Sequence, residues 1–315
     1  MPTLSNQHVQ RVVSSFTHQL HNLFGANLLG FYLYGSVSLG AYEEGISDID
    51  FLAVLAQEMT PLQLIKLRRA YQTACEKDAL AKTFEGNFIL QNKLFLDNTV
   101  PCPQVYDGAF HVAAPRDWNA VTLYNLYHHG LSVKGPSPKS LLTPVTERDL
   151  IKTMLGNLLY LEQRMPYYAQ HSLEYQVFGV LTLCRILYTV ETGKITSKRQ
   201  AAEYVLGKGE IVGVERTGTG SNGFGLTEPW LGIVRMALAL LDRAVATTAS
   251  KDMTNRVNLH SHSRQDKADF ADQSVNDIRA DFPIKDLADE DALVAFVRLV
   301  KGMTEEIVAG NKKWK

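Results

Sequence analysis

Residues 28–55 of the 315-residue chain read LLGFYLYGSVSLGAYEEGISDIDFLAVL. Two segments of this stretch, 28–36 and 47–55, are short, apolar and rich in aromatic or β-branched residues, which predicts two strands. The hydrophobic spacing on either side predicts an opening amphipathic helix, a second helix at 61–74 and another strand-like segment at 84–96. A small unit of mixed helices and strands is therefore expected in the first third of the chain.

The composition is that of an ordinary folded protein. Apolar residues make up 45% and charged residues 21% of the chain, which excludes disorder as the dominant state. The net charge of -1 gives no overall field for nucleic acid or an anionic membrane. Three scattered cysteines favour a reducing compartment, and neither a secretory signal nor a membrane-spanning apolar run is visible. We therefore expect a cytoplasmic protein, with neither nucleic acid nor membrane as a partner.

The later part of the chain has a helical texture. A segment rich in proline and glycine after Gly130, SVKGPSPKSLLTPV, is the best candidate for a domain boundary. Beyond it the spacing predicts helices at 146–164, 175–192, 200–206, 230–246 and 291–308. Two long loops, 207–225 and 251–285, interrupt this set. The sequence thus predicts an α+β protein, with an N-terminal mixed-sheet domain at 1–140 and a C-terminal all-helical domain at 141–315.

Asp48 and Asp50 are the strongest chemical signal in the sequence. Strand alternation places both carboxylates on one face, while Ile49 and Phe51 point into the core. Two carboxylates this close repel each other unless a cation lies between them, and oxygen ligands favour Mg²⁺ bound to a polyphosphate. An ordinary edge strand with two solvated acids is the plainer alternative. The Gly-Ser pair that ends the upstream strand favours the metal site.

Gly35 and Ser36 suit a phosphate. Gly35 allows the backbone to approach closely, and the Ser36 amide and hydroxyl can donate to phosphate oxygens. A phosphate cradle followed by a metal-binding pair is what nucleotidyl transfer requires. Glu85 opens the next predicted strand, where Gly86 leaves space beside it. This carboxylate could complete the metal ligands or accept a proton from an acceptor hydroxyl, although a solvated strand-edge glutamate is the commoner case.

The stretch FYLYGSVSLGAYEEGISDIDFLAVL resembles the nucleotidyltransferase motif of the DNA polymerase β superfamily. More narrowly, it resembles the aminoglycoside 3''/9-adenylyltransferases, which inactivate streptomycin and spectinomycin. Two further segments are similar to that family, RDWNAVTLYNLYHHGLSVKGPSPKSLLTPV and LTLCRILYTVETGKITSKRQAAEYVL. The similarity covers most of residues 28–206. It implies a polymerase β-like nucleotidyltransferase domain and a helical domain, with the substrates meeting in a cleft.

The resemblance implies that AMP moves from Mg-ATP to a hydroxyl of a small molecule, with release of pyrophosphate. The acceptor would be an aminoglycoside or aminocyclitol antibiotic, a reaction that confers antibiotic resistance, and a monomer is expected. Glu85 is implied as the catalytic base beside the Mg²⁺ ligands Asp48 and Asp50, with Glu85 also available to the metal. The residues expected to bind the triphosphate are Gly35, Ser36, Ser47, Arg185 and Lys198.

The acceptor half of the site departs from the family. Two Asp residues that receive the drug's cations there fall here on His171 and Tyr175, and Glu174 is the acid that remains in this stretch. The family's drug-stacking Trp has no counterpart in residues 101–115. Spectinomycin or another polyol is therefore left open as the acceptor. Two alternatives also remain, an enzyme of this fold that modifies a protein or another non-drug hydroxyl, and a non-catalytic ATP sensor.

Overall fold

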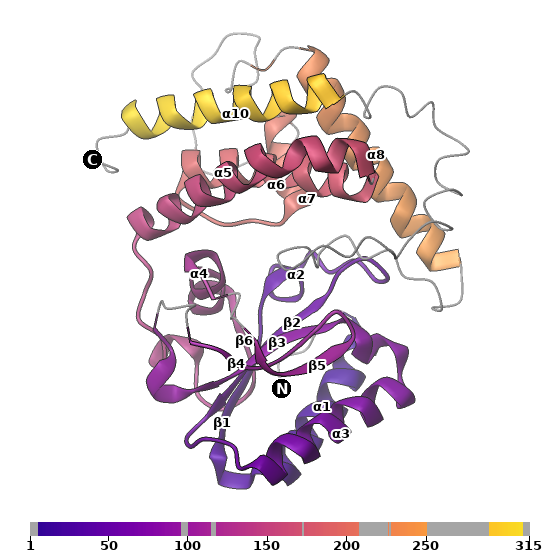
Figure 1. Cartoon of the computed structure of the whole chain (residues 1–315), viewed down its shortest axis with the longest axis vertical. Helices are drawn as coiled ribbons and strands as arrows, with labels where there is room; N and C mark the ends of the chain where they lie inside the picture. Colours follow the sequence, from indigo (N-terminus) through magenta and orange to yellow (C-terminus); the bar gives the residue numbers. More distant parts are fainter. Residues whose placement is uncertain are drawn as a thin grey trace. The chain divides into compact units, whose positions relative to one another are not determined.

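The structure, a computed structural model, describes residues 6–95, 100–114, 118–171, 173–207, 226, 228–250 and 290–310. These residues form two compact units, shown in Figure 1. The first contains the described residues up to Val145 except Glu44–Ile46, and the second contains Glu44–Ile46 and the described residues from Thr146 onward. The first unit carries a sheet and the second is helical. The predicted α+β class is confirmed.

The first unit is built on a six-stranded mixed sheet of order β5-β4-β3-β2-β1-β6. Its strands are β1 (Leu28–Leu33), β2 (Ile49–Leu55), β3 (Phe84–Leu90), β4 (Cys102–Tyr106), β5 (Ala109–Ala114) and β6 (Leu131–Lys134). β2 and β3 pair in parallel, and the other neighbours pair antiparallel. The parallel register sets Asp50 opposite Glu85, which determines where the two carboxylates meet.

Two helices, α1 (Gln7–Phe24) and α3 (Pro61–Lys77), pack together beside one face of the sheet (Figure 1). Phe16 of α1 is fully buried at the centre of this core, and its ring centroid lies 6.3 Å from that of Phe31, 6.0 Å from Phe51 and 5.1 Å from Phe84. Rings at these separations attract one another beyond the area that they bury. Phe51 therefore points into the core, as its alternation with Asp50 predicts.

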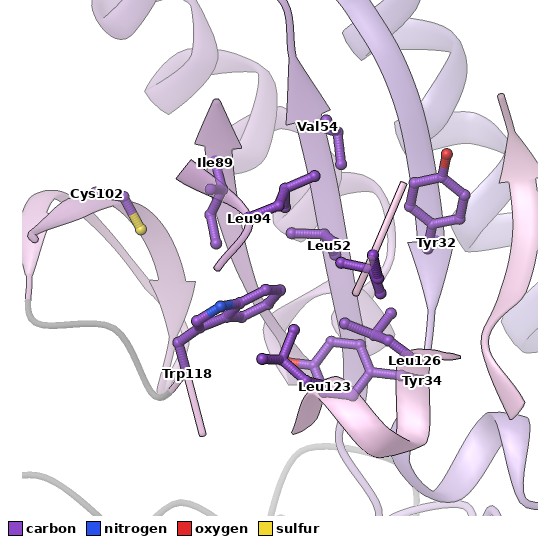
Figure 2. Close-up of a cluster of buried hydrophobic side chains, with 11 residues drawn as sticks. Tyr32, Tyr34, Leu52, Val54, Ile89, Leu94, Cys102, Trp118, Leu123 and Leu126 are labelled. Atoms are coloured by element: carbon purple, nitrogen blue, oxygen red, sulfur yellow. The ribbon is translucent and has the colours of Figure 1, made fainter. Parts of the chain in front are cut away.

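The opposite face of the sheet is also buried. Helix α4 (Ala120–His129) packs over it, and Figure 2 shows the side chains of the second core. The members of this cluster are Tyr32, Tyr34, Leu52, Val54, Ile89, Leu94, Cys102, Trp118, Leu123, Leu126 and Leu142. Strand β2 is thus covered on both sides, which explains why its sequence runs on as FLAVL rather than alternating with polar residues.

Three local details differ from the sequence-based expectation. The strand expected at 84–96 ends at Leu90, where a single 3₁₀ turn begins. The hairpin of β4 and β5 was not expected, although Asp107 and Gly108 both adopt positive φ, 52° and 67°, as tight hairpin turns require. β6 lies inside the stretch that its proline and glycine content marks as a boundary.

The second unit is a bundle of helices. These are α5 (Glu147–His171), α6 (Leu173–Thr192), α7 (Lys198–Val205), α8 (Glu228–Ser250) and α10 (Glu290–Gly310). α6 contacts the other four, and by length and composition it could cross a membrane, yet 72% of its apolar window is buried inside the protein. Such burial is typical of a core helix. The expected loops at 207–225 and 251–285 lie outside the described residues, apart from Gly207.

Gly86 of β3 has a packing role that differs from the sequence-based interpretation. A Cβ atom on this residue would lie 2.5 Å from ring carbons of Phe51 and 2.5 Å from the Phe51 carbonyl oxygen. Phe51, in the core beneath α1 and α3, therefore occupies the space beside Gly86, and this space is not left for Glu85. A methyl group there would force a shift in tightly packed atoms.

We expect Gly86→Ala to lower the midpoint of thermal unfolding by several degrees, because overpacking a core costs about 1–3 kcal/mol. Gly156→Ala on α5 is the matched control, since a Cβ atom there meets nothing within 4 Å. The control should be neutral or stabilising by up to about 1 kcal/mol. Circular dichroism melting curves of the two variants test this packing role, and equal midpoints would contradict it.

Candidate active site

Asp50 and Glu85 stand side by side near the starts of β2 and β3. Their Cα atoms are register partners in the parallel pair, and both side chains are half-buried. Partners in register project to the same face of a sheet, and neighbouring strands lie about 4.8 Å apart. The fold thus brings together two carboxylates from different segments of the chain, as their expected places on adjacent strands require.

Asp48 lies just before β2 and is the most buried of the three acids, with 5% of its surface exposed. Burying a carboxylate is costly unless a cation or hydrogen bonds compensate it. Among the described residues, no group of three or more His, Cys, Asp or Glu side chains forms a ready metal site. Mg²⁺ ordinarily takes one or two carboxylates and completes its shell with water and phosphate oxygens. Asp48 and Asp50 fit that donor chemistry, and Glu85 as a further ligand stays a prediction.

Gly35 lies directly against the Asp50 carboxylate. It adopts φ +64°, and a Cβ atom built on it would collide with the Asp50 Oδ2 atom. The preceding residue is also fixed to the strand, because the Tyr34 amide donates to the Asp50 carbonyl oxygen at 3.1 Å. Only glycine allows both the left-handed backbone and this close approach. In this structure the group that approaches Gly35 is the Asp50 carboxylate, and the approach of a phosphate stays a prediction.

The turn that follows, α2 (Gly35–Ser38), is held by a residue that the sequence did not single out. The Gly35 amide donates to Asn125 Oδ1 at 3.1 Å, and the Ser38 hydroxyl donates to the same oxygen at 2.9 Å. Asn125 lies on α4, ninety residues beyond Gly35. No spacing rule links residues so far apart, so only the folded chain reveals this contact.

The two serines expected at the phosphates have different surroundings. Ser36 is half-buried within α2. Ser47 is 4% exposed, and its hydroxyl oxygen accepts a hydrogen bond from the Glu43 amide at 3.0 Å. The Ser47 amide in turn donates to the Glu43 carbonyl oxygen at 2.8 Å. Ser47 therefore closes the loop that leads into β2, and its binding to a phosphate stays a prediction.

Arg185 and Lys198 belong to the helical unit. The Lys198 ammonium, at the start of α7, lies 4.1 Å from the centroid of the Phe178 ring on α6. Arg185 follows Phe178 by seven residues, which is two helical turns, so it projects from the same side of α6. A cation above a ring face is stabilised by the π-electrons. The two predicted phosphate ligands thus share one side of α6, and their contact with phosphate stays a prediction.

Glu174 is a half-buried acid near the start of α6. Burial raises the pKa of its carboxyl from 4.5 to about 7, because the charged form loses hydration. Its Oε1 atom has no hydrogen-bond partner among the described residues. The rings of Tyr168 and Tyr175, which lie close to Glu174 in the sequence, stack on each other with their centroids 5.1 Å apart. A half-buried carboxyl without a hydrogen-bond partner on Oε1 among the described residues is a candidate for binding an organic cation.

The chain is similar to known adenylyltransferases. The family model described as "Aminoglycoside adenylyltransferase, C-terminal domain" matches residues 140–208. The spectinomycin 9-adenylyltransferases of Staphylococcus aureus strains Mu50 and N315 are each 26% identical over 199 residues, covering 59% of this chain and 73% of the relative. The crystal structure of the spectinomycin adenyltransferase AAD(9) from Enterococcus faecialis with ATP and spectinomycin aligns with a TM-score of 0.59 at 16% identity. That alignment covers 93% of this chain and 99% of the other.

The family-model match and the curated relatives show homology to adenylyltransferases, and the solved structure shares the fold. Within that class, the chain is a distant homologue of the aminoglycoside adenylyltransferase family. The family resemblance noted from the sequence is thereby confirmed. Most of the family-model match falls in the helical unit, and the sheet unit carries the three carboxylates.

The effect of the Gly35–Asp50 contact on stability can be measured separately from the effect of a left-handed backbone. Gly40 has nearly the same φ, +67°, but a Cβ atom there meets nothing within 4 Å. We expect Gly40→Ala to cost about 1 kcal/mol of stability, the price of a left-handed backbone. Gly35→Ala should cost clearly more, because the methyl group must also displace the Asp50 carboxylate. Urea unfolding of the two variants measures the difference, and equal costs would contradict the contact.

Glu174 gives the protein a measurable dependence on pH. Because its folded pKa is raised to about 7 from 4.5, the folded state binds more protons than the unfolded state between these values. The contribution of Glu174 to the free energy of unfolding is therefore most favourable below about pH 4.5. It is lost as the pH rises to about 7. Glu174→Gln is always neutral, so it should match the wild type near pH 4.5 and be more stable than the wild type at pH 8.

Thermal unfolding of Glu174→Gln and wild type across this range measures the effect. Glu306→Gln is the control, because it removes an exposed carboxylate from α10 of the same unit. A difference between Glu174→Gln and wild type that does not change with pH would show that Glu174 titrates normally in the folded protein.

Proposed function

We propose that this protein is a Mg²⁺-dependent adenylyltransferase that transfers AMP from ATP to a hydroxyl of an aminoglycoside or aminocyclitol. The observation that carries the proposal is the register pairing of Asp50 with Glu85, with Gly35 packed against Asp50. The names of the relatives support the choice of reaction, since the Staphylococcus aureus proteins are spectinomycin 9-adenylyltransferases. The Enterococcus faecialis protein has been crystallised with ATP and spectinomycin.

The reaction requires one bond to form and one to break. The acceptor hydroxyl oxygen bonds to the α-phosphorus of ATP, and the bond from that phosphorus to the oxygen leading to the β-phosphate breaks. Pyrophosphate leaves, and the proton of the hydroxyl passes to the Glu85 carboxylate. Asp48 and Asp50 would hold Mg²⁺, which supplies neutralisation of the triphosphate charge when bound. The half-buried position of Glu85 beside Asp50 suits a base that must stay close to the metal ligands.

Further donors and cations are proposed as ligands of the phosphates. The Ser36 amide and hydroxyl would donate to phosphate oxygens beside Gly35. Arg185 and Lys198 would neutralise the charge that develops on the leaving pyrophosphate, the role in which charge-assisted hydrogen bonds are strongest. Their common side of α6 supports the assignment of both cations to one polyphosphate.

Glu174 is the group that we propose receives an ammonium of the acceptor. The positions of the family's drug-binding acids hold His171 and Tyr175 here, so the acid one residue before Tyr175 takes their part. A cation binds the ionised carboxylate, which is available above a pKa of about 7. The KM for a cationic acceptor should therefore fall as the pH rises through 7, until the acceptor's own amines lose their charge.

Pyrophosphate release from ATP tests the proposal directly. We expect Mg²⁺-dependent release with at least one member of a panel of streptomycin, spectinomycin and other aminoglycosides. Asp50→Asn should lose at least about a hundredfold in kcat, because the metal ligand stabilises charge in the transition state. Its melting temperature should stay near that of the wild type, since a half-buried rim residue contributes little packing.

Glu76→Gln is the matched control, because it removes an exposed carboxylate from α3 of the same unit and should keep full activity. Full activity in Asp50→Asn would overturn the mechanism. If the wild type binds Mg-ATP but releases no pyrophosphate with any compound of the panel, the proposed nucleotide site stands and the drug is rejected as the acceptor. In that case, a protein hydroxyl should be sought by mass spectrometry after incubation with labelled ATP.

A further inference from the structure

Asn125 connects helix α4 to the turn beside Asp50. Its side chain is 4% exposed, and its Oδ1 atom accepts hydrogen bonds from the Gly35 amide at 3.1 Å and the Ser38 hydroxyl at 2.9 Å. The same hydroxyl lies 3.0 Å from the Gly35 carbonyl oxygen. One amide oxygen therefore binds both ends of α2, the four-residue turn from Gly35 to Ser38.

The helix that carries Asn125 is itself well fixed. Its first turn is capped by Asn119, whose Oδ1 atom accepts hydrogen bonds from the amides of Val121 and Thr122 at 2.9 and 3.2 Å. Leu123 and Leu126, on either side of Asn125 in sequence, are buried in the second core shown in Figure 2. Side chains held on a packed helix are placed more accurately than side chains on loops.

The turn needs such an external anchor. Gly35 adopts a left-handed backbone, and glycine has more conformational freedom to lose than any other residue. Its position also matters more than most, because there is no room for even a methyl group between it and the Asp50 carboxylate. The hydrogen bond to Asn125 further means that the Gly35 amide is already engaged, so donation to a phosphate falls to the residue that follows.

We infer that Asn125 is a positioning residue, which holds the Gly35–Ser38 turn in the conformation that receives the polyphosphate of the nucleotide. This inference rests on the proposed function, because it assumes that a nucleotide binds beside Asp50. Asn125 acts through Gly35 and Ser38 and does not itself contact the reacting atoms. The residue therefore sets affinity for the nucleotide, whereas affinity for the acceptor is independent of it.

The test is the affinity for Mg-ATP, measured by isothermal titration calorimetry on the full chain, together with the KM values for ATP and for the acceptor. Asn125→Leu removes the shared acceptor atom at similar volume and should raise the Kd and the KM for ATP about tenfold, as expected for one lost buried hydrogen-bond partner. The KM for the acceptor should stay unchanged. A merely structural asparagine would not separate the two KM values.

Leu126→Ala is the control for stability, because it weakens the packing of α4 while the Asn125 amide stays in place. It should lower the melting temperature and leave the Kd for Mg-ATP near that of the wild type. An increase in Kd equal to that of Asn125→Leu would overturn the inference, since general loosening of α4 would then explain both. Equal Mg-ATP binding by wild type and folded Asn125→Leu would overturn it as well.

A second pair of variants serves if Asn125→Leu does not fold. Ser38→Ala removes one of the two donors to Asn125 Oδ1 and leaves the Gly35 amide in place. It should therefore raise the Kd for Mg-ATP by about threefold, less than Asn125→Leu does. Ser140→Ala removes an exposed hydroxyl that donates to the Ser137 carbonyl oxygen, and it should have no effect. Equal Kd values for these two variants would overturn the inference. Absence of Mg-ATP binding by the wild type would overturn the proposed function, and this inference with it.

Discussion

The parallel pairing of β2 with β3 is the interaction on which the rest of the structure depends. Parallel neighbours need a crossover, which α3 provides here. The same pairing places β2 inside the sheet, so that Phe51 packs under α1 and Leu52 packs under α4. Because the register sets Asp50 opposite Glu85, the strand that builds both cores also positions the carboxylates.

How much the sequence could predict follows from the range of each interaction. Local periodicity was enough for β1, β2 and the helices of the second unit, because alternation and the helical repeat are read within a few residues. It also placed Phe51 in the core, with Asp50 on the opposite face. The second core, the true end of β3 and the role of Gly86 depend on contacts with distant segments, which spacing does not record. The hairpin at Asp107 and Gly108 is an exception, because the Asp-Gly pair is a local signal for a tight turn.

Two acidic residues of α6, Glu174 and Glu191, differ in whether another residue compensates their burial. α6 is buried over most of its length, so each charged side chain on it carries a cost of dehydration. Glu191 has a structural partner, the Tyr204 hydroxyl, which donates to it at 2.6 Å. Among the described residues, Glu174 Oε1 has no such partner, and burial raises the pKa of its carboxyl to about 7. We propose that an ammonium of the acceptor supplies this compensation when the carboxyl is ionised.

The choice of an amide at position 125 fits the electrostatics of the sheet unit. Asp48, Asp50 and Glu85 already gather negative charge where a polyphosphate is proposed to bind, so the turn must be held without adding to it. An amide oxygen accepts the hydrogen bonds of Gly35 and Ser38 as a carboxylate would, but it brings no net charge. Asn125 can therefore orient the turn without adding to the repulsion of a negatively charged nucleotide. We infer that neutrality at position 125 serves the proposed nucleotide site, because the Asp50 carboxylate already lies against the turn.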